Sequence, residues 1–547
     1  MRIGIDLDNT IINYDEAFKL ATKEINLSLP DTVRTKSEIR DFIRYELKDE
    51  LLWQRLQGLT YGRCLHKGGK LFPCVKRFLW RCKRLGHTVI IVSHKTEYGH
   101  FDSEKISLRQ AARNFLHSKG LLNDNNALVS NIFFESTRQE KVNRIQTLNF
   151  DVFIDDLVEI IEKFSQSSFI RKILFVPNQS ISIEQEVALS RKEITIANDW
   201  QSIDFLINGA WTLEDTEAIA KMILASIGKV ESIKEGGNAG VYKIQISSLE
   251  YAKIKIYPCD STHDRLHSEF EGLKALQKCH ISNVPKPIYK DKEMRIAAYS
   301  WIDGHIIKQH NQFHIRVCLE FLDRIHKVRN SQEFETFSPA SAACFSGADI
   351  LYQLECRLIQ FDACRVKYHA LNYFLENDFI PVTQQLISWS QENWNDSIDF
   401  NSPLPRKRQT ISPSDFGFHN MIQFKDNCFF VDFEYLGWDD PTKLISDFFF
   451  HPGMKLSREQ KELWISGTLN IYGHDLQSRL RASLPLFGLI WCLILLNDYR
   501  DSIWQRRLLA DCSRQGRRTE ILDDQLNLAK SLLKIIKLNY RNFLSEV

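Results

Sequence analysis

Short apolar runs alternate with longer helical stretches over the first 208 residues of the chain. The strand-like runs are Arg2–Asp6, Thr88–Ser93, Val152–Asp155, Lys172–Val176 and Ile194–Ala197. This alternation predicts a parallel β-sheet with helices on both faces. Ligands of such sheets bind outside the carboxyl ends of the strands, so the polar residues that follow these runs are candidate site residues.

The pattern changes after residue 212. Hairpin-like strands are expected around 229–257 and 294–302, and mostly helices follow, interrupted by one strand pair around 421–424 and 428–433. No internal repeat or long Pro/Gly linker is visible, so we predict two domains, residues 1–208 and 212–547. The apolar run Leu484–Leu496 is too short to span a bilayer and contains Pro485, which favours a buried helix.

Composition and net charge limit the classes of function that we expect for the chain. The chain has 547 residues, of which 44% are hydrophobic and 26% charged, as is typical of globular proteins. A net charge of +2 favours neither nucleic acid nor an anionic membrane as a partner. The 12 cysteines are scattered without a Cys-x-x-Cys pair. Because Arg2 and Asp6 interrupt any signal peptide, we expect reduced thiols and a cytoplasmic location. The oligomeric state is not indicated.

Polar clusters follow the strand-like runs of the first domain. Asp6 and Asp8 follow the first run, Ser93 ends the second and Asp155–Asp156 ends the third, while Lys141 lies on the helix before it. Buried carboxylates need a cation or a hydrogen-bond network in place of water. Each cluster alone has a structural alternative: a turn, a helix cap or a solvated charge. Together they converge on one edge of the sheet.

The segment DLDNT, with Ser93, Lys141 and the pair Asp155–Asp156, resembles the four motifs of haloacid dehalogenase superfamily phosphatases. The resemblance covers about residues 1–200 and implies a Rossmann-like α/β fold with a helical cap at about 15–75. It implies that Asp6 is the nucleophile and that Asp8 is the acid and base. It further implies phosphate contacts from Thr10, Ser93 and Lys141, and a Mg²⁺ site formed by Asp6, Asp8, Asp155 and Asp156.

The expected cap contains the amphipathic segment TKSEIRDFIRYELKDELLWQRL. A cap would cover the site and select the substrate, whereas a surface helical hairpin without substrate contact is the alternative. His66, Lys67 and Lys70 are either basic substrate contacts or solvated surface charges.

The second domain has its own constellation in ISPSDFGFHNMIQFKDNCFFVDFEYLGWDDP. Asn420 follows Asp415 by five residues, and Asp432 lies twelve residues further on, at the end of an apolar strand. Kinases need a carboxylate that receives the hydroxyl proton, and an Asn and an Asp that bind the metals bridging the ATP phosphates. The spacing fits a catalytic loop, a hairpin and a metal-binding Asp.

Upstream residues could complete a nucleotide site. The turn GGNAGVYKI contains Gly237 and Asn238, and Lys255 stands on the strand that follows. Glu269 lies on the next helix, whose buried face is predicted to be Leu266, Phe270, Leu273 and Leu276. An ion pair between Lys255 and Glu269 would position the lysine on phosphates, although a routine surface pair is the alternative.

These residues, with VPKPI and YSWIDG, resemble the aminoglycoside phosphotransferase and choline kinase-like family. The resemblance covers 212–547 and implies an α+β protein-kinase-like bilobal fold, with an N-lobe at about 212–305 and a C-lobe at 306–547. It implies Asp415 as catalytic base and Asn420 and Asp432 as Mg²⁺ ligands. The implied ATP-binding residues are Gly237, Asn238, Lys255, Glu269, Ser300 and Ile302. The family usually has His two residues before the catalytic Asp, where Pro413 stands here.

Together the resemblances predict a bifunctional small-molecule phosphatase and kinase with Mg²⁺ and ATP. Its partners would be a phosphorylated metabolite, a hydroxyl acceptor and a nucleotide. Sequential action on one metabolite, such as a sugar or amino-alcohol precursor of a surface polysaccharide, would avoid futile ATP use. Opposed activities under regulation, or one catalytically dead half, are alternatives. The basic segment Arg506–Arg518 is either a pocket for a phosphorylated substrate or a solvated face.

Overall fold

The structure is a computed structural model and describes residues 1–101, 104–122, 126–163, 170–177, 183–224, 227–233, 240–259, 263–510 and 514–544. The chain divides into two compact units. Unit 1 contains Met1–Thr216 and the short segments Pro258–Ser261 and Asp291–Arg295, and unit 2 contains Glu217–Tyr257, Thr262–Lys290 and Ile296–Val547. Each unit is described by itself.

A six-stranded sheet forms the centre of unit 1. Its order is β5 (Asn131–Glu135), β4 (Thr88–His94), β1 (Arg2–Ile5), β6 (Val152–Asp155), β7 (Arg171–Phe175) and β8 (Ile194–Ala197). All neighbouring strands are parallel. The five strands expected from the sequence are therefore present. We missed β5, a short edge strand that contains Ile132, Phe133 and Phe134 but in which only Ile132 is buried.

Helices cover both faces of this sheet. One face packs against α5 (Val75–Arg84) and α10 (Trp200–Asn208), and the other packs against α7 (Arg138–Thr147) and α8 (Val158–Lys163). The remaining helices of this region are α6 (Leu108–Ser118), α9 (Ile183–Ser190) and α11 (Leu213–Ile223), the last of which crosses the unit boundary. A sheet buried on both faces explains the continuous Val/Ile runs of its strands.

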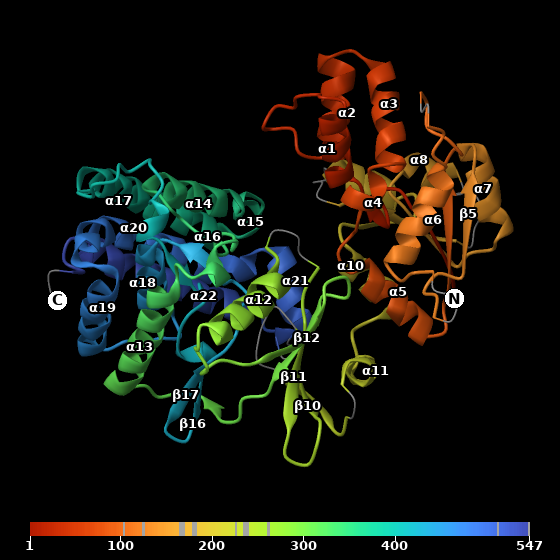
Figure 1. The fold of residues 1–547 in the computed structure, drawn as a ribbon. Coiled ribbons are helices and arrows are strands. Elements are labelled where there is room, and N and C mark those ends of the chain that lie inside the picture. The colour runs from red at the N-terminus through yellow and green to blue at the C-terminus, as the bar shows by residue number, and fades with distance from the viewer. Residues whose placement is uncertain are drawn as a thin grey trace. The chain divides into compact units, whose positions relative to one another are not determined.

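A helical insertion follows β1. It contains α1 (Asp15–Glu24), α2 (Lys36–Asp41), η1 (Phe42–Glu46), α3 (Glu50–Tyr61) and α4 (Leu65–Gly68). The short strands β2 (Ile12–Asn13) and β3 (Lys70–Leu71) pair antiparallel, so the insertion leaves and returns at one point beside Asp8, which bridges to Ile12. Figure 1 shows α1, α2 and α3 standing together at one end of unit 1. The expected helical segment is thus present.

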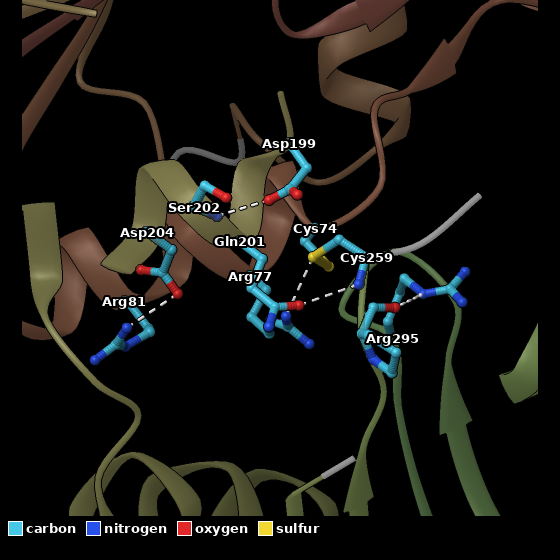
Figure 2. The surroundings of a disulfide bond; sticks show 10 residues. Cys74, Arg77, Arg81, Asp199, Gln201, Ser202, Asp204, Cys259 and Arg295 are labelled. Carbon is cyan, nitrogen blue, oxygen red and sulfur yellow. Dashed lines mark hydrogen bonds and ion pairs between the residues drawn. A yellow bond between two sulfur atoms is a disulfide. The ribbon is translucent and has the colours of Figure 1, made fainter. Parts of the chain in front are cut away.

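A disulfide bond joins Cys74, which precedes α5, to Cys259. Figure 2 shows its surroundings, where the Arg77 guanidinium donates to the Cys259 sulfur at 3.3 Å and Gln201 accepts from the Cys259 backbone N–H at 3.2 Å. Our expectation of reduced cysteines is therefore wrong for this pair. Scattered cysteines gave no signal because the two are 185 residues apart in sequence. The cytoplasmic location stays a prediction.

Unit 2 begins with an antiparallel sheet that forms an N-lobe. The strand order is β12 (Pro287–Asp291), β13 (Ile296–Ser300), β11 (Tyr251–Ile256), β10 (Gly240–Gln245) and β9 (Val230–Ile233). Helix α12 (Arg265–Lys278) packs on the sheet and buries the predicted face through Leu266, Leu273 and Leu276. In Figure 1 the N-lobe strands lie together at one end of unit 2.

The C-lobe is mainly helical. Its helices are α13 (Gln312–Val328), η2 (Gln332–Phe334), α14 (Gly347–Ile359), α15 (Asp362–Lys367), α16 (His369–Tyr373), η3 (Phe374–Phe379), α17 (Ile380–Glu392), η4 (Arg406–Arg408), η5 (Phe418–Asn420), α18 (Pro441–Phe450), α19 (Arg458–Tyr472), η6 (His474–Leu476), α20 (Gln477–Leu495), η7 (Leu496–Tyr499), α21 (Asp501–Ala510) and α22 (Arg518–Asn539). Short antiparallel strands carry the catalytic-loop region: β14 (His305–Ile306), β15 (Thr410–Ser412), β16 (Met421–Phe424), β17 (Asn427–Phe430) and β18 (Gly437–Asp439).

Helix α20 is the central helix of the C-lobe. It packs against α14, α17, α18 and α22, and its residues from Ala482 to Ile490 are buried. The stretch His474–Tyr499 is long and apolar enough to cross a membrane, but 72% of its apolar 18-residue segment is buried inside the protein. The expectation of a buried helix around Leu484–Leu496 agrees with this packing.

The disulfide gives a direct prediction. With a protease site inserted after Gly209, the fragments should run as one band on a non-reducing gel and separate after dithiothreitol, because Cys74 and Cys259 lie on different fragments. Cys74→Ser should release the fragments without reductant. The matched control is Cys82→Ser, a buried thiol on α5 outside the bond, which should leave them linked. Separation of the wild-type fragments without reductant would contradict the bond.

Candidate active sites

The carboxyl ends of β1 and β6 bring Asp6 and Asp155 together in unit 1. Lys141 joins them, because its ammonium lies 2.6 Å from a carboxylate oxygen of each. The lysine stands in the first turn of α7, whose start is fixed by a capping box between Thr137 and Glu140. All three charged side chains are buried.

Asp156 completes a cluster with Asp6 and Asp155, whose ligand oxygens all lie within 4.8 Å of one another. Thr10 donates to Asp6 at 3.5 Å and to Asp156 at 3.4 Å. Burial raises the pKa of Asp6 well above its usual range, with Lys141 opposing, and burial together with Asp155 raises that of Asp156 to about 7. One lysine cannot neutralise three carboxylates, and hard oxygen donors suit Mg²⁺, so the donor set fits this ion.

Asp8 is held apart from that cluster. Its carboxylate forms an ion pair with Lys95 at 2.8 Å and accepts a hydrogen bond from the Tyr14 hydroxyl at 2.6 Å. Burial acts to raise the pKa of Asp8, but Lys95 and Tyr14 together keep it below its ordinary value. The Asp8 side chain is therefore a weaker candidate for a metal ligand than the sequence motif implies.

Ser93 is buried, and no residue in the described part of the chain is hydrogen-bonded to its hydroxyl. A buried hydroxyl without a protein partner is free to bind a ligand oxygen. The insertion contributes Lys36, at the start of α2, whose ammonium lies 5.6 Å from the centre of the Tyr61 ring. Burial opposes the shift, but Tyr61, followed by Asp156 and Asp8, raises the pKa of Lys36. His66, Lys67 and Lys70 are exposed on the surface.

In unit 2, Lys255 is the centre of a second buried cluster. Its ammonium contacts Glu269 at 2.7 Å, Asp432 at 2.5 Å and Glu434 at 2.9 Å. The pairing of β11 with β10 and β13 places the lysine inside the sheet, and α12 supplies the fully buried Glu269. The surface-pair alternative for Lys255 and Glu269 is therefore wrong.

The carboxyl groups of Glu269 and Asp432, which both contact this lysine, differ in pKa. Tyr257 donates to Glu269 at 2.7 Å, and although burial opposes it, Lys255 lowers the pKa of Glu269 to about 2. Burial raises the pKa of Asp432 to about 6 against the effect of Lys255, with Glu434 acting in the same direction as burial. Glu434 also pairs with Arg265 at 3.2 Å. Asp432 therefore offers a carboxylate that a cation would return to the ionised state.

The catalytic-loop residues lie between β15 and β16. Asn420 donates through Nδ2 to the backbone oxygen of Asp415 at 2.9 Å, and His419 bonds a carboxylate oxygen of Asp415 at 2.9 Å. The His419 ring stacks on His451 with centroids 4.2 Å apart. Pro413 is buried before the loop. Burial raises the pKa of Asp415, but the His419 hydrogen bond, the charges of His419 and His451 and a hydrogen bond from Asn420 together keep that pKa below its ordinary value.

Two of the residues expected to bind ATP, Ser300 and Ile302, lie in the part of the chain that the structure describes. Ser300 ends β13 and its hydroxyl accepts from the backbone N–H of Lys286 at 2.8 Å, while Ile302 lies half-buried in the connection to the C-lobe. Their role at adenine stays a prediction. Gly237 and Asn238 lie outside the described residues.

One stretch of the chain matches a known protein family. Residues 229–482 match the family model described as "Phosphotransferase enzyme family", which spans Lys255, Glu269, Asp415, Asn420 and Asp432. Residues 229–482 are therefore similar to a phosphotransferase domain. No curated protein matches the sequence.

Several solved structures resemble the chain at low identity. A spectinomycin phosphotransferase in complex with ADP and spectinomycin is 13% identical over 62% of this chain and 99% of that chain, with a TM-score of 0.43. Choline kinase from Cryptosporidium parvum Iowa II is 14% identical over 61% and 98%, with a TM-score of 0.39. An ethanolamine kinase from Plasmodium vivax is 15% identical over 68% and 98%, with a TM-score of 0.41. These TM-scores are all below 0.5, so only the family match bears on what residues 229–482 are similar to.

The basic segment near the C-terminus of the phosphotransferase domain is internally paired. Arg507 and Arg514 both contact the buried Asp498, at 2.8 and 2.7 Å, and Arg518 pairs with Asp501. Arg517 is exposed and pairs with Glu520, as the solvated-face interpretation expects, and the pocket for a phosphorylated substrate stays a prediction. The Arg506 side chain lies outside the described part of the chain.

Sequence reasoning missed four site residues: Lys95, Tyr14, His419 and Glu434. Lys95 stands two residues after Ser93, and alternate strand positions share a face, so that spacing was an available signal. Glu434 was visible in the Asp-Phe-Glu motif at the same spacing from Asp432. Tyr14 and His419 had no such periodic signal, because a turn places each of them.

The raised pKa of Asp156 predicts pH-dependent metal binding in unit 1. Below pH 7 the carboxylate is protonated and must lose its proton to bind Mg²⁺, whereas above pH 7 it is already ionised. Mg²⁺ affinity should therefore be about tenfold higher at pH 8 than at pH 6. Isothermal titration of a chain carrying Asp432→Asn, which disables the second site, measures this. A further Asp156→Asn exchange is the control and should reduce the pH dependence to the part that Asp6 contributes, whereas a flat profile without this exchange would contradict the assignment.

Proposed function

We propose that the phosphotransferase domain moves the γ-phosphate of ATP to the hydroxyl of a small molecule. The observation that carries the proposal is the Lys255 cluster, in which one buried lysine meets both Glu269 and Asp432. The match of residues 229–482 to a phosphotransferase family supports the same reaction. Pro413 and Ser414 precede Asp415 where protein kinases have His-Arg, and Glu434 ends the Asp432 motif where they have Gly, which favours a small acceptor such as a sugar or amino alcohol.

Each residue has a distinct role in this transfer. Lys255, oriented by Glu269, binds ATP phosphates, and Asp415 takes the proton of the acceptor hydroxyl as its oxygen bonds to phosphorus. Asn420 and Asp432 would hold Mg²⁺, which neutralises phosphate charge when bound. The bond from the γ-phosphorus to the bridging oxygen breaks, and ADP leaves with that oxygen.

The kinase assignment predicts separable effects of two substitutions. Asp415→Asn should lower turnover on the order of a hundredfold or more and keep Mg-ATP binding, because the phosphate contacts remain. Asp432→Ala should weaken Mg-ATP binding as well, because a metal ligand is lost. The matched control is Asp426→Asn, an exposed carboxylate in the turn between β16 and β17, which should change neither.

A panel of sugars, sugar phosphates, amino alcohols and aminoglycosides with Mg-ATP, followed by mass spectrometry, measures turnover, and calorimetry measures ATP binding. Failure of the wild-type chain to bind Mg-ATP would overturn the kinase proposal.

We also propose that unit 1 hydrolyses a phosphate monoester, as the resemblance to haloacid dehalogenase phosphatases suggests. The specific observation in favour is the unpartnered buried hydroxyl of Ser93 at the sheet edge that carries the Asp6–Lys141 pair. Asp6 would attack phosphorus and form an aspartyl phosphate as the ester oxygen leaves, and Asp8 would give that oxygen a proton and later take one from water. Lys141 and Ser93 would hold phosphate oxygens, and a bound Mg²⁺ would offset their charge.

Asp6→Asn tests the nucleophile alone. Release of phosphate from p-nitrophenyl phosphate should fall on the order of a thousandfold or more, because the amide cannot form the covalent intermediate. Asp31→Asn, an exposed carboxylate in the insertion, is the control and should retain wild-type turnover. Full activity of Asp6→Asn in a clean preparation would show that the covalent mechanism is wrong.

Two such activities on one chain favour sequential handling of one metabolite at two positions. The Asp6→Asn chain would then accumulate a doubly phosphorylated species, whereas the Asp415→Asn chain would dephosphorylate the precursor at the other position. A catalytically inactive unit 1 that only binds a phosphorylated ligand is the alternative, and the Asp6→Asn comparison separates the two.

A further inference from the structure

The catalytic loop departs from its family pattern at one position. The family usually has His two residues before the catalytic Asp, and Pro413 stands there in this chain. A proline ring offers no hydrogen-bond donor. Any side-chain hydrogen bond that supports the catalytic loop must therefore come from another residue.

The structure places a histidine that follows the aspartate in sequence within hydrogen-bonding distance of its carboxylate. His419, in the η5 turn, bonds Oδ1 of Asp415 through Nε2 at 2.9 Å, while Asn420 fixes the Asp415 backbone. The Asp415 side chain remains 40% exposed. His419 thus holds one carboxylate oxygen, while the group keeps access to an incoming hydroxyl.

His419 is itself fixed by the turn that follows α18, residues 451–454. His451 stacks on it with an interplanar angle of 9°, accepts the Gly453 N–H through Nδ1 at 3.1 Å, and packs its ring edge against Trp491. Met454, from the same turn, fills the space beside Gly417, where an added Cβ would lie 1.5 Å from its terminal carbon. The ring of His419 is therefore confined by its neighbours.

Asp415, His419 and His451 also offer ligand atoms within 4.8 Å of one another. A metal shared by both rings fits poorly. The lone pairs of imidazole nitrogens lie in the ring planes, and the planes of two stacked rings do not converge on one point. Support of the aspartate is the role that the geometry fits.

We propose that His419 is a positioning residue that orients the catalytic base Asp415, in place of the histidine that Pro413 removes. This inference rests on the proposed kinase function. It goes beyond the family pattern, because the donor lies four residues after the aspartate and not two before it. The residue touches Asp415 and not the substrate.

The test compares His419→Leu, His419→Gln and the wild-type full chain. Leucine keeps bulk without a donor, and glutamine carries an amide N–H at a reach similar to that of Nε2. His419→Leu should lower kcat about 10- to 100-fold, the range for loss of a hydrogen bond to a charged group, with the KM for ATP changed less than about twofold. His419→Gln should recover most of kcat. The control is His474→Leu, an exposed histidine bonded to Asn470, which should not alter kcat.

The assay uses Mg-ATP with water as acceptor, followed by phosphate release, and then with ethanolamine, choline and spectinomycin. A wild-type chain that neither binds nor turns over Mg-ATP overturns the kinase function, and this inference with it. If the wild type is active, unchanged kcat in His419→Leu shows that Asp415 needs no support from His419. Equal loss of kcat in His419→Leu and His419→Gln shows that the hydrogen bond is not the cause and also overturns the inference.

Discussion

Each site of this protein depends on one buried lysine surrounded by more carboxylates than it can neutralise. Lys141 meets Asp6 and Asp155 in unit 1, and Lys255 meets three acidic side chains in unit 2. Removing charged groups from water is costly unless partners replace the hydration. Burial, with neighbouring carboxylates acting in the same direction, raises the pKa of Asp6 well above its usual range, that of Asp156 to about 7 and that of Asp432 to about 6. Both clusters are therefore suited to a divalent cation and to the phosphate that it would accompany.

The two units reach this arrangement by different means. In unit 1 the parallel register of β1 and β6 places their carboxyl ends side by side, so sheet topology alone brings Asp6 and Asp155 together. In unit 2, Lys255 stands on an antiparallel strand. Its partner Glu269 comes from α12, and its partners Asp432 and Glu434 come from a loop of the C-lobe. Packing between these elements sets that geometry, so the cluster depends on how the lobes close within unit 2.

This difference explains how far the sequence could predict the structure. Strand-end motifs located Asp6, Ser93 and Asp155, because apolar runs and their ends are local signals. The helical insertion was also visible from its amphipathic pattern. The Lys95–Asp8 pair, the Tyr14 hydrogen bond and the Cys74–Cys259 bond were not, because each joins residues through tertiary packing that no local period encodes. For the same reason the pairing of Arg507 and Arg514 with Asp498 could not be anticipated.

Two residues at or next to the candidate sites have a left-handed backbone conformation. Asp432 has φ +67° and Asn9, next to Asp8, has φ +63°, both in the left-handed region. Such conformations cost on the order of 1 kcal/mol or more and persist where surrounding contacts fix them. For Asp432 those contacts are the Val431 N–H bond to Asn420 and the buried Phe433 ring on either side. The core of the C-lobe thus holds this candidate metal ligand in a conformation that the loop alone would not favour, and Asn420 is part of the same restraint.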